Sequence, residues 1–378
     1  MKKKIILVSS SLKPFEIFLR ELIISLSKYY EITLVTNISH SKSEFLKNFN
    51  FINIPITRKI NLFDDLLALI KLRIIINEIR PKLIISITPK GGFYSAICNL
   101  FLKNKHLHFI TGQNWINKNG IKKNFFKFID KFTFHSTDFL LSDSHSQINY
   151  LGKEKFNISK IQLIKYGSIC GVDTDIFRPD EMEKKNLRKI YGINDSEVVI
   201  LFLGRINKEK GVFKLYDVCK KLYQNNYPIK IFYVGEIEDS SFNKIINDDK
   251  KDLAILKHFN FTNSPEKFMK ISDIFCLPSS REGFGLSIIE ASSSGLPVLG
   301  SNIIGLKDSI VHNETGILFD IDSGNDFYNN LKKLVISKKI RDTLGLKGRK
   351  RVNQYFKKND VINFIETYIK KILNSNKF

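Results

Sequence analysis

Two glutamates and two glycines stand close together in the second half of the chain. They occur as Glu282-Gly283-Phe284-Gly285 and then, beyond four further residues, Glu290. The glycines let the backbone turn sharply and approach a ligand without a Cβ clash. If a helix begins here, the amides of residues 284–287 lie at its N-terminus and can bind a phosphate. The carboxylates would suit sugar hydroxyls; a helix cap with two surface glutamates is the alternative.

A second segment bounded by glycines carries two cations. It runs from Gly204 to Gly211 and contains Arg205 and Lys210. A guanidinium fork and an ammonium can together bind a diphosphate. A solvated basic turn is the alternative, and the segment lacks the GxxxxGK[ST] order of a P-loop.

Few residues have the spacing of metal ligands. Asp173 and Asp175 resemble a metal-binding Asp-x-Asp motif, but they lie in a linker bounded by glycine and proline, where we expect a hinge. His106 and His108 suit one face of a strand, and no carboxylate or cysteine stands near them in the sequence. The four cysteines form no CxxC pair. We therefore expect no metal site and no disulfide framework.

Short apolar runs alternate with helical periods, which is typical of an α/β fold. The first half predicts strands over 5–8, 31–36, 83–87, 107–110 and 139–141, a helix within 15–26, and an amphipathic helix over 62–80. The pattern restarts after residue 180 with strands over 198–204, 229–235 and 274–277, the first two ending in glycine. A helix follows over 212–224, and the chain is almost continuously helical over 324–373. We therefore expect two successive α/β domains.

Length and composition fit this division. A chain of 378 residues suits two or three domains, and 43% hydrophobic with 26% charged residues excludes disordered and fibrous classes. No uncharged apolar run reaches about 18 residues, and the apolar run after Lys4 is too short for a signal peptide. We expect a cytoplasmic protein.

The formal charge of +22 is spread along the chain, with one local concentration of lysines. These lysines alternate with aromatic residues between 103 and 134, and Phe125, Phe128 and Phe132 can share one helical face. The lysines are Lys103, Lys105, Lys118, Lys122, Lys123, Lys127 and Lys131, and the aromatic residues also include Trp115, Phe126 and Phe134. An anionic membrane could bind this stretch; a core-facing helix with a solvated lysine edge is the alternative. Without an RRM, KH, zinc-finger or helix-turn-helix signature, we expect no nucleic-acid partner.

Three segments in this order resemble a known family. They are Gly171-Val172-Asp173 with Phe177-Arg178-Pro179, then Gly204-Arg205 with Lys210-Gly211, then Pro278-Ser279 with Glu282 to Glu290. Together they resemble the retaining glycosyltransferases of family 4, which have the GT-B fold. The segments Thr88–Gly91, Thr111–Trp115 and Lys165–Ser168 are similar to the subgroup that builds bacterial O-antigen and capsule repeat units.

The resemblance implies two Rossmann-like domains facing across a cleft. Residues 1–175 would bind the acceptor, with a C-terminal helix over about 359–378 crossing back to them, and residues 176–358 would bind a nucleotide sugar. We expect a UDP-linked hexose or N-acetylhexosamine as donor, no metal or other cofactor, and a lipid-linked saccharide as acceptor. The enzyme would associate peripherally with the anionic inner membrane. A GT-B sugar-nucleotide epimerase or hydrolase is the alternative, and a basic nucleic-acid-binding protein is a more distant one.

The resemblance also assigns roles to residues. Arg205 and Lys210 would neutralise the departing diphosphate, and Glu282 would contact the hydroxyls of the donor sugar. The backbone from Gly283 through Phe284 to Gly285 would lie near sugar and phosphates, and Glu290 would bind the ribose, with Leu286 and Ser287 nearby.

The first domain departs from the family pattern at two loops. Ser9-Ser10-Ser11-Leu12-Lys13-Pro14 replaces a glycine-rich loop, and Gln113 stands where many relatives have a histidine. Lys13 and Gln113 are therefore the candidates for contact with the acceptor or the reacting sugar. Phe259-Asn260-Phe261 also replaces a common glycine in the base-binding loop.

Overall fold

The computed structural model describes residues 2–38, 44–57, 60–102 and 104–375. Contacts divide the chain into two units: unit 1 comprises Met1–Cys170 and Asn359–Phe378, and unit 2 comprises Gly171–Lys358. The division thus falls at Cys170, whereas the sequence placed it after residue 175. Each unit is described by itself.

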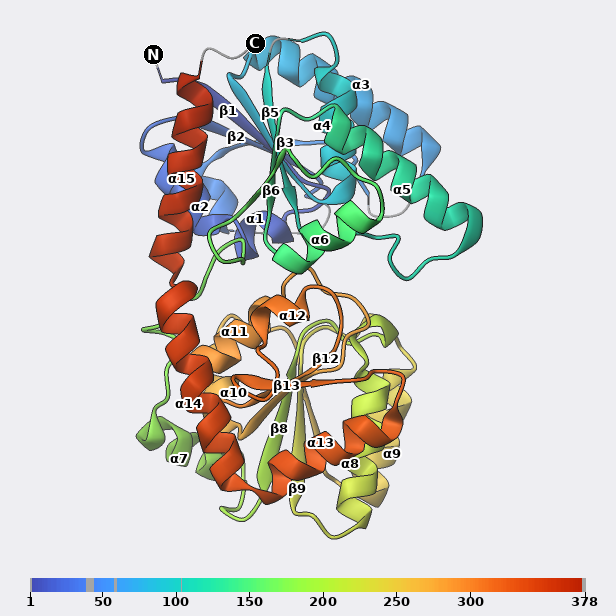
Figure 1. Cartoon of the computed structure of the whole chain (residues 1–378), viewed down its shortest axis with the longest axis vertical. Helices are drawn as coiled ribbons and strands as arrows, with labels where there is room; N and C mark the ends of the chain where they lie inside the picture. Colours follow the sequence, from blue (N-terminus) through green and yellow to red (C-terminus); the bar gives the residue numbers. More distant parts are fainter. Residues whose placement is uncertain (1, 39–43, 58–59, 103, 376–378) are drawn as a thin grey trace. The chain divides into compact units, whose positions relative to one another are not determined.

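Unit 1 contains a seven-stranded parallel sheet in the order β3-β2-β1-β4-β5-β6-β7 (Figure 1). The strands are β1 (Lys4–Val8), β2 (Glu31–Thr36), β3 (Asn50–Asn53), β4 (Leu83–Ile87), β5 (Lys105–Ile110), β6 (Phe139–Ser142) and β7 (Ile161–Leu163). The helices are α1 (Lys13–Ile17), α2 (Arg20–Ser27), η1 (Glu44–Asn48), α3 (Leu62–Ile79), α4 (Pro89–Asn99), α5 (Gly120–His135), α6 (His145–Lys153) and α15 (Lys358–Asn374).

Alternate residues of the unit 1 strands pack into different cores. Ile5 and Leu7 of β1 belong to a cluster with α2 and α15, whereas Ile6 and Val8 belong to a cluster with α3 and α4. This alternation follows from the two-residue period of a strand. The sheet is therefore covered by helices on both faces, as the sequence predicted.

Unit 2 repeats the plan with a six-stranded parallel sheet in the order β10-β9-β8-β11-β12-β13. The strands are β8 (Val198–Leu203), β9 (Ile229–Val234), β10 (Leu256–Phe259), β11 (Ile274–Leu277), β12 (Val298–Ser301) and β13 (Gly316–Phe319). The helices are α7 (Glu181–Ile190), η2 (Lys208–Lys210), α8 (Val212–Gln224), α9 (Phe242–Asp252), α10 (Pro265–Ile271), α11 (Leu286–Ser293), α12 (Leu306–Ser309), α13 (Gly324–Ile336) and α14 (Lys338–Tyr355). The prediction of two Rossmann-like α/β domains is confirmed.

Two predicted helices differ in detail from the structure. The helix expected within residues 15–26 is two short helices, α1 and α2. The nearly continuous helix expected over 324–373 is three helices, and its first break lies at Ser337, whose hydroxyl caps α14 by accepting a hydrogen bond from the amide of Ile340. The side chain of a serine can accept a hydrogen bond from a backbone amide a few residues further along the chain. This favours the start of a new helix at Ser337 over continuation of α13.

The predicted basic and aromatic surface is partly internal. Trp115 is fully buried, stacks on Phe156 with 5.8 Å between ring centroids, and donates its indole N–H to Asp130 at 2.7 Å. Phe134 is also buried. The prediction that Trp115 and Phe134 contribute to a surface is therefore wrong, because tertiary contacts cover them.

The lysines of this stretch also differ in their environments. Lys105 is buried, and its ammonium donates to the carbonyl oxygens of Ile372 and Ser375 near the end of α15. Lys127 binds Glu154 at 2.5 Å, while Lys122 and Lys131 are exposed. Lys103 lies outside the described residues. The stretch is thus not one continuous basic surface.

Candidate functional site

The two glycine-bounded loops of unit 2 leave the same edge of the sheet. β8 and β11 are neighbouring parallel strands, with Ile200 paired to Ile274 and Leu201 paired to Phe275. The loop from Gly204 to Gly211 follows β8, and the loop that begins at Pro278 follows β11. Because the carboxyl ends of parallel strands meet at one edge, the topology brings these two segments together.

Backbone contacts hold the two loops against each other. The amide of Ser280 donates to the carbonyl oxygen of Glu209 at 2.8 Å. Gly211 has a φ of +72°, and a Cβ built there would lie 2.0 Å from the carbonyl oxygen of Pro278. Only glycine therefore permits both this conformation and this approach.

Lys210 and Glu282, which the resemblance assigned to the adjacent diphosphate and sugar of the donor, form an ion pair. The Lys210 ammonium lies 2.5 Å from a carboxylate oxygen of Glu282, and the two side chains are 16% and 13% exposed. The sequence separates these residues by 72 positions, and only the pairing of β8 with β11 brings them together. The pair places an ammonium directly beside a carboxylate.

A second ion pair stands beside the first. Arg281 donates through Nε and Nη2 to the two carboxylate oxygens of Glu209, at 2.6 and 3.1 Å. Burial alone would raise the pKa of Glu209, but the Arg281 guanidinium outweighs it and lowers the pKa. Glu209 therefore stays ionised, and this bidentate pair fixes the relative positions of the two loops.

Arg205 is held by a residue that the sequence analysis did not identify. Its Nη1 donates to both carboxylate oxygens of Glu238, at 3.1 and 2.9 Å, and Asn207 donates to the same carboxylate at 2.8 Å. Glu238 follows β9, the strand next to β8, and Ile206 and Ile237 form a backbone bridge between the two loops. The strand-and-glycine pattern ending at Gly235 was the available signal, because it marks a third loop at this edge.

The helix expected after Gly285 is present as α11. Gly285 is its N-cap with a φ of +80°, and a Cβ there would lie 2.5 Å from Leu306 Cδ2. Leu286 and Ser287 form the first turn and are half-exposed. The Phe284 side chain is 4% exposed and packs against Phe356 at 5.4 Å, so only its backbone can contact a ligand.

Glu290 lies one turn inside α11 and is half-buried. Its carboxyl group has no hydrogen-bond partner among the residues that the structure describes. Removal from water, and to a lesser extent the nearby charge of Glu266, raises its pKa to about 7. A shielded carboxyl group without an internal partner can accept hydrogen bonds from ligand hydroxyls.

Asp173 has a structural role at the start of unit 2. One carboxylate oxygen accepts the amides of Asp175 and Ile176 at 3.2 and 3.3 Å, and the other binds the Lys358 ammonium at 2.7 Å. Burial would raise the pKa of Asp173, but Lys358 outweighs it and the pKa is lowered. Within residues 2–38, 44–57, 60–102 and 104–375, no group of three or more His, Cys, Asp or Glu side chains could hold a metal ion.

The candidate acceptor residues both lie at the carboxyl edge of the unit 1 sheet. Lys13 begins α1 after β1 and is exposed. Gln113 follows β5, is only 1% exposed, and donates through Nε2 to Gln147 at 3.3 Å. Gln113 therefore lies beneath the surface in this conformation, whereas the Lys13 side chain is exposed.

Thr88 joins two loops at this same edge. Its hydroxyl oxygen accepts the amides of Ser10 and Gly91, at 3.1 and 3.3 Å. Thr88 has a φ of +76°, which is an outlier for a β-branched residue. The motif from Thr88 to Gly91 thus fixes the loop after β1, which leads to Lys13 at the start of α1, against the start of α4.

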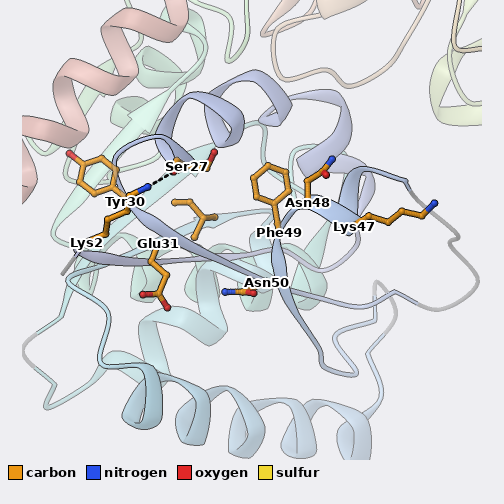
Figure 2. Close-up of a pocket in the computed structure, with 9 residues that line it drawn as sticks. Lys2, Ser27, Tyr30, Glu31, Lys47, Asn48, Phe49 and Asn50 are labelled. Atoms are coloured by element: carbon orange, nitrogen blue, oxygen red, sulfur yellow. Dashed lines mark hydrogen bonds between the residues drawn. The ribbon is translucent and has the colours of Figure 1, made fainter.

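Figure 2 shows a pocket at the opposite edge of the unit 1 sheet, with a volume of about 550 Å³. Its lining includes Lys2, just before β1, and Glu31 and Asn50, the first residues of β2 and β3. Lys13 and Gln113 follow the carboxyl ends of their strands. The pocket therefore does not belong to the candidate acceptor region.

Both units match models of known families. Residues 183–351 match the family described as glycosyl transferases group 1, and residues 4–144 match the family described as glycosyl transferase 4-like. The two matches together extend over most of the chain and fall one in each unit.

Individual proteins show the same similarity. The chain is 27% identical over 311 residues to the capsular polysaccharide biosynthesis glycosyltransferase CapM of Staphylococcus aureus, covering 80% of each protein. It is 32% identical over 175 residues to an Escherichia coli UDP-Gal:alpha-D-GlcNAc-diphosphoundecaprenol alpha-1,3-galactosyltransferase, covering 44% of each. The structure of HepE from Anabaena, solved with UDP and glucose, superposes with a TM-score of 0.79 over 98% of this chain and 100% of HepE, at 15% identity. At that identity the superposition establishes the fold.

Among the described residues, no helix combines the length and the apolar character needed to cross a membrane.

Proposed function

This chain belongs to the glycosyltransferase group 1 family and is a transferase, and we propose that it moves a hexose or N-acetylhexosamine from a UDP-linked donor to a lipid-linked saccharide. The observation that carries the proposal is the Lys210–Glu282 contact at the carboxyl edge of the unit 2 sheet. It brings a cation suited to phosphate into contact with a carboxylate suited to sugar hydroxyls.

The choice of UDP and of a lipid-linked acceptor draws on the relatives. The E. coli relative is named for UDP-galactose and a diphosphoundecaprenol acceptor, CapM for capsular polysaccharide synthesis, and HepE was solved with UDP. We propose the corresponding role here, in the synthesis of a bacterial capsule or O-antigen repeat unit at the inner membrane. The enzyme would be cytoplasmic and would associate with the membrane at its surface.

Two cations stabilise the leaving group in this proposal. The Lys210 ammonium binds the diphosphate, and Arg205 offers it the edge of the guanidinium that does not face Glu238. Charge accumulates on the diphosphate as the glycosidic bond breaks, so cations placed beforehand stabilise the transition state more than the ground state. They supply the positive charge that a metal ion would otherwise supply, and the reaction proceeds with retention at the anomeric carbon.

The remaining contacts bind the sugar and the nucleoside. Glu282 exchanges part of its contact with Lys210 for hydroxyl groups of the donor sugar. The backbone at Gly283 and Gly285 and the first turn of α11 approach sugar and phosphates, since helix N-termini favour anions. Glu290, which has no partner among the described residues, accepts the ribose hydroxyls.

A panel of nucleotide sugars tests the proposal. A ligand at 100 times its dissociation constant adds about 2.7 kcal/mol to the free energy of unfolding, so the true donor and its nucleotide raise the melting temperature. The stabilising donor is then incubated with lipid-linked saccharides, with and without EDTA, and products are identified by mass spectrometry. Transfer that survives EDTA supports the proposal. Donor turnover without any acceptor would identify an epimerase or hydrolase instead, and strict dependence on Mg²⁺ or Mn²⁺ would refute the metal-free mechanism.

A further inference from the structure

Helix α3 is apolar on two opposite sides, although it lies on the outside of unit 1. Its inner side packs against the sheet through Ala68, Leu72, Ile75 and Ile76. A helix that is apolar all round is normally covered all round. The described part of unit 1 covers only the inner side of α3. We therefore expect the outer side to be covered by a binding partner.

The outer side of α3 carries a continuous row of exposed apolar side chains. Leu62, Leu66, Ile70 and Ile74 follow one another at four-residue spacing and are 82%, 60%, 50% and 49% exposed. Residues at this spacing lie one above the other on a helix, so the row runs about 18 Å along the axis. Phe63, 77% exposed, widens its first turn. Contiguous apolar surface of this kind marks an interaction site.

Helix α5 carries a second row on the same face of the sheet. Ile121, Phe125 and Phe128 are 88%, 52% and 68% exposed and share one side of the helix. Helix α4 lies beside both helices. The Lys90 ammonium of α4 lies 2.6 Å from a carboxylate oxygen of Asp65 of α3. Phe93 of α4 packs on Phe132 of α5, with 5.8 Å between the ring centroids. Figure 1 shows α3, α4 and α5 together along one side of unit 1. The two rows therefore belong to one layer.

The charges beside these rows are mainly positive. Lys71 on α3 and Lys122 and Lys131 on α5 are exposed. Four carboxylates lie on these two helices. Asp65 is bound to Lys90, Asp130 is buried, and Asp64 is half-buried and accepts a hydrogen bond from Asn61, which leaves Glu78 as the exposed one. Apolar side chains bordered by lysines are the pattern of helices that lie in the interface of an anionic bilayer.

We propose that the outer sides of α3 and α5 form the surface by which the enzyme binds an anionic lipid bilayer. The inference rests on the proposed function, because a lipid-linked acceptor brings the enzyme to the membrane. A second copy of the chain fits less well, since a symmetric contact would bring these lysines against themselves. The surface centres on α3, which the sequence analysis predicted as an amphipathic helix and did not consider as a surface. The amphipathic prediction is wrong, because apolar side chains lie on both the inner and the outer side of this helix. Phe125 and Phe128 remain from the stretch that the sequence analysis proposed.

The test compares two pairs of substitutions with similar exposure. Leu66→Ser with Ile70→Ser alters the α3 row, and Ile336→Ser with Leu346→Ser, at positions 61% and 72% exposed in unit 2, is the control. The probe is a vesicle of phosphatidylglycerol and phosphatidylcholine, with binding measured by co-sedimentation at low and high salt. We expect the α3 pair to weaken binding by at least about tenfold, and the control pair to leave it unchanged.

Further measurements separate this inference from the proposed function. All variants should keep the wild-type increase in melting temperature with UDP, which reports the donor site alone. If the wild-type protein does not bind the vesicles, or if the α3 pair binds them as strongly as wild type, the proposed membrane-binding surface is refuted. The proposed donor site is unaffected by either result. If light scattering shows that wild type is a dimer and the α3 pair a monomer, the surface is a contact between copies and the inference is wrong. Loss of the UDP effect in wild type would instead refute the proposed function.

Discussion

Lys210 and Glu282 form a contact that permits a quantitative test of the proposed donor site. We consider Lys210→Met, Glu282→Gln and the double variant. Each single substitution removes a contact to charge or hydroxyl groups at the reacting centre, which should lower kcat by about 10²- to 10³-fold, or about 2.7 to 4 kcal/mol. Lys210 is 2.5 Å from Glu282, so the two effects should also be coupled.

The coupling has a definite sign. In Lys210→Met the Glu282 carboxylate loses its cation and stands beside the bound diphosphate, so part of the loss is repulsion. Replacing Glu282 by glutamine removes that repulsion, and the double variant should therefore lose less than the sum of the two single losses. Coupling between residues in contact is about 0.5 to 3 kcal/mol.

The folded state must also be checked, because the pair is only 16% and 13% exposed. Leaving one partner unpaired should lower the free energy of unfolding by about 1 to 3 kcal/mol, less than for a fully buried pair. Urea unfolding measures this cost, and initial rates at saturating donor and acceptor measure kcat. Additive losses, or single losses below about fivefold in folded protein, would refute the assignment of both residues to the donor site.

Three further predictions concern charge and pH. Glu238→Gln should raise the KM for the donor more than it lowers kcat, because Arg205 loses the carboxylate that orients it; an unchanged KM would mean that Arg205 does not need this partner. Glu290, with a pKa raised to about 7, should make UDP affinity depend on pH near neutrality, and calorimetry of Glu290→Gln should show weaker binding without that dependence. Burial lowers the pKa of His106 to about 3 and of His108 to about 4, so both rings are neutral in the folded protein at pH 7. Below pH 6.5 both imidazole rings become protonated in the unfolded chain but stay neutral in the folded protein. The free energy of unfolding should therefore fall as pH decreases, by about 2 kcal/mol per ring at pH 5. Urea midpoints at pH 7 and pH 5 measure this loss, and His106→Gln with His108→Gln should reduce it.

The sequence by itself identified the parallel α/β plan and the two glycine-bounded loops that carry the candidate donor-site residues. β8 is fully apolar and β4 is apolar except for Ser86, because a parallel sheet covered on both faces buries the side chains on both sides of a strand. Such strands can be recognised in the sequence as continuous apolar runs. Lys210 and Glu282 were found because each follows such a strand, beside a glycine that the backbone requires. The short strands β7, β10 and β12 were not predicted, whereas the equally short β6 and β11 were. Three or four residues carry little pattern, so strands of this length are recognised unevenly.

Only the tertiary structure decided which side chains meet and which are covered. The pairing of Arg205 with Glu238 spans 33 residues and depends on the order of β8 and β9 in the sheet. Trp115 stands among lysines in the sequence, yet it is buried because Phe156, Tyr150 and Asp130 from other segments surround it. In α3 apolar residues occur on every side, so periodicity cannot say which side packs on the sheet. Whether a side chain is exposed depends on which other residues pack against it, and those residues come from distant parts of the chain.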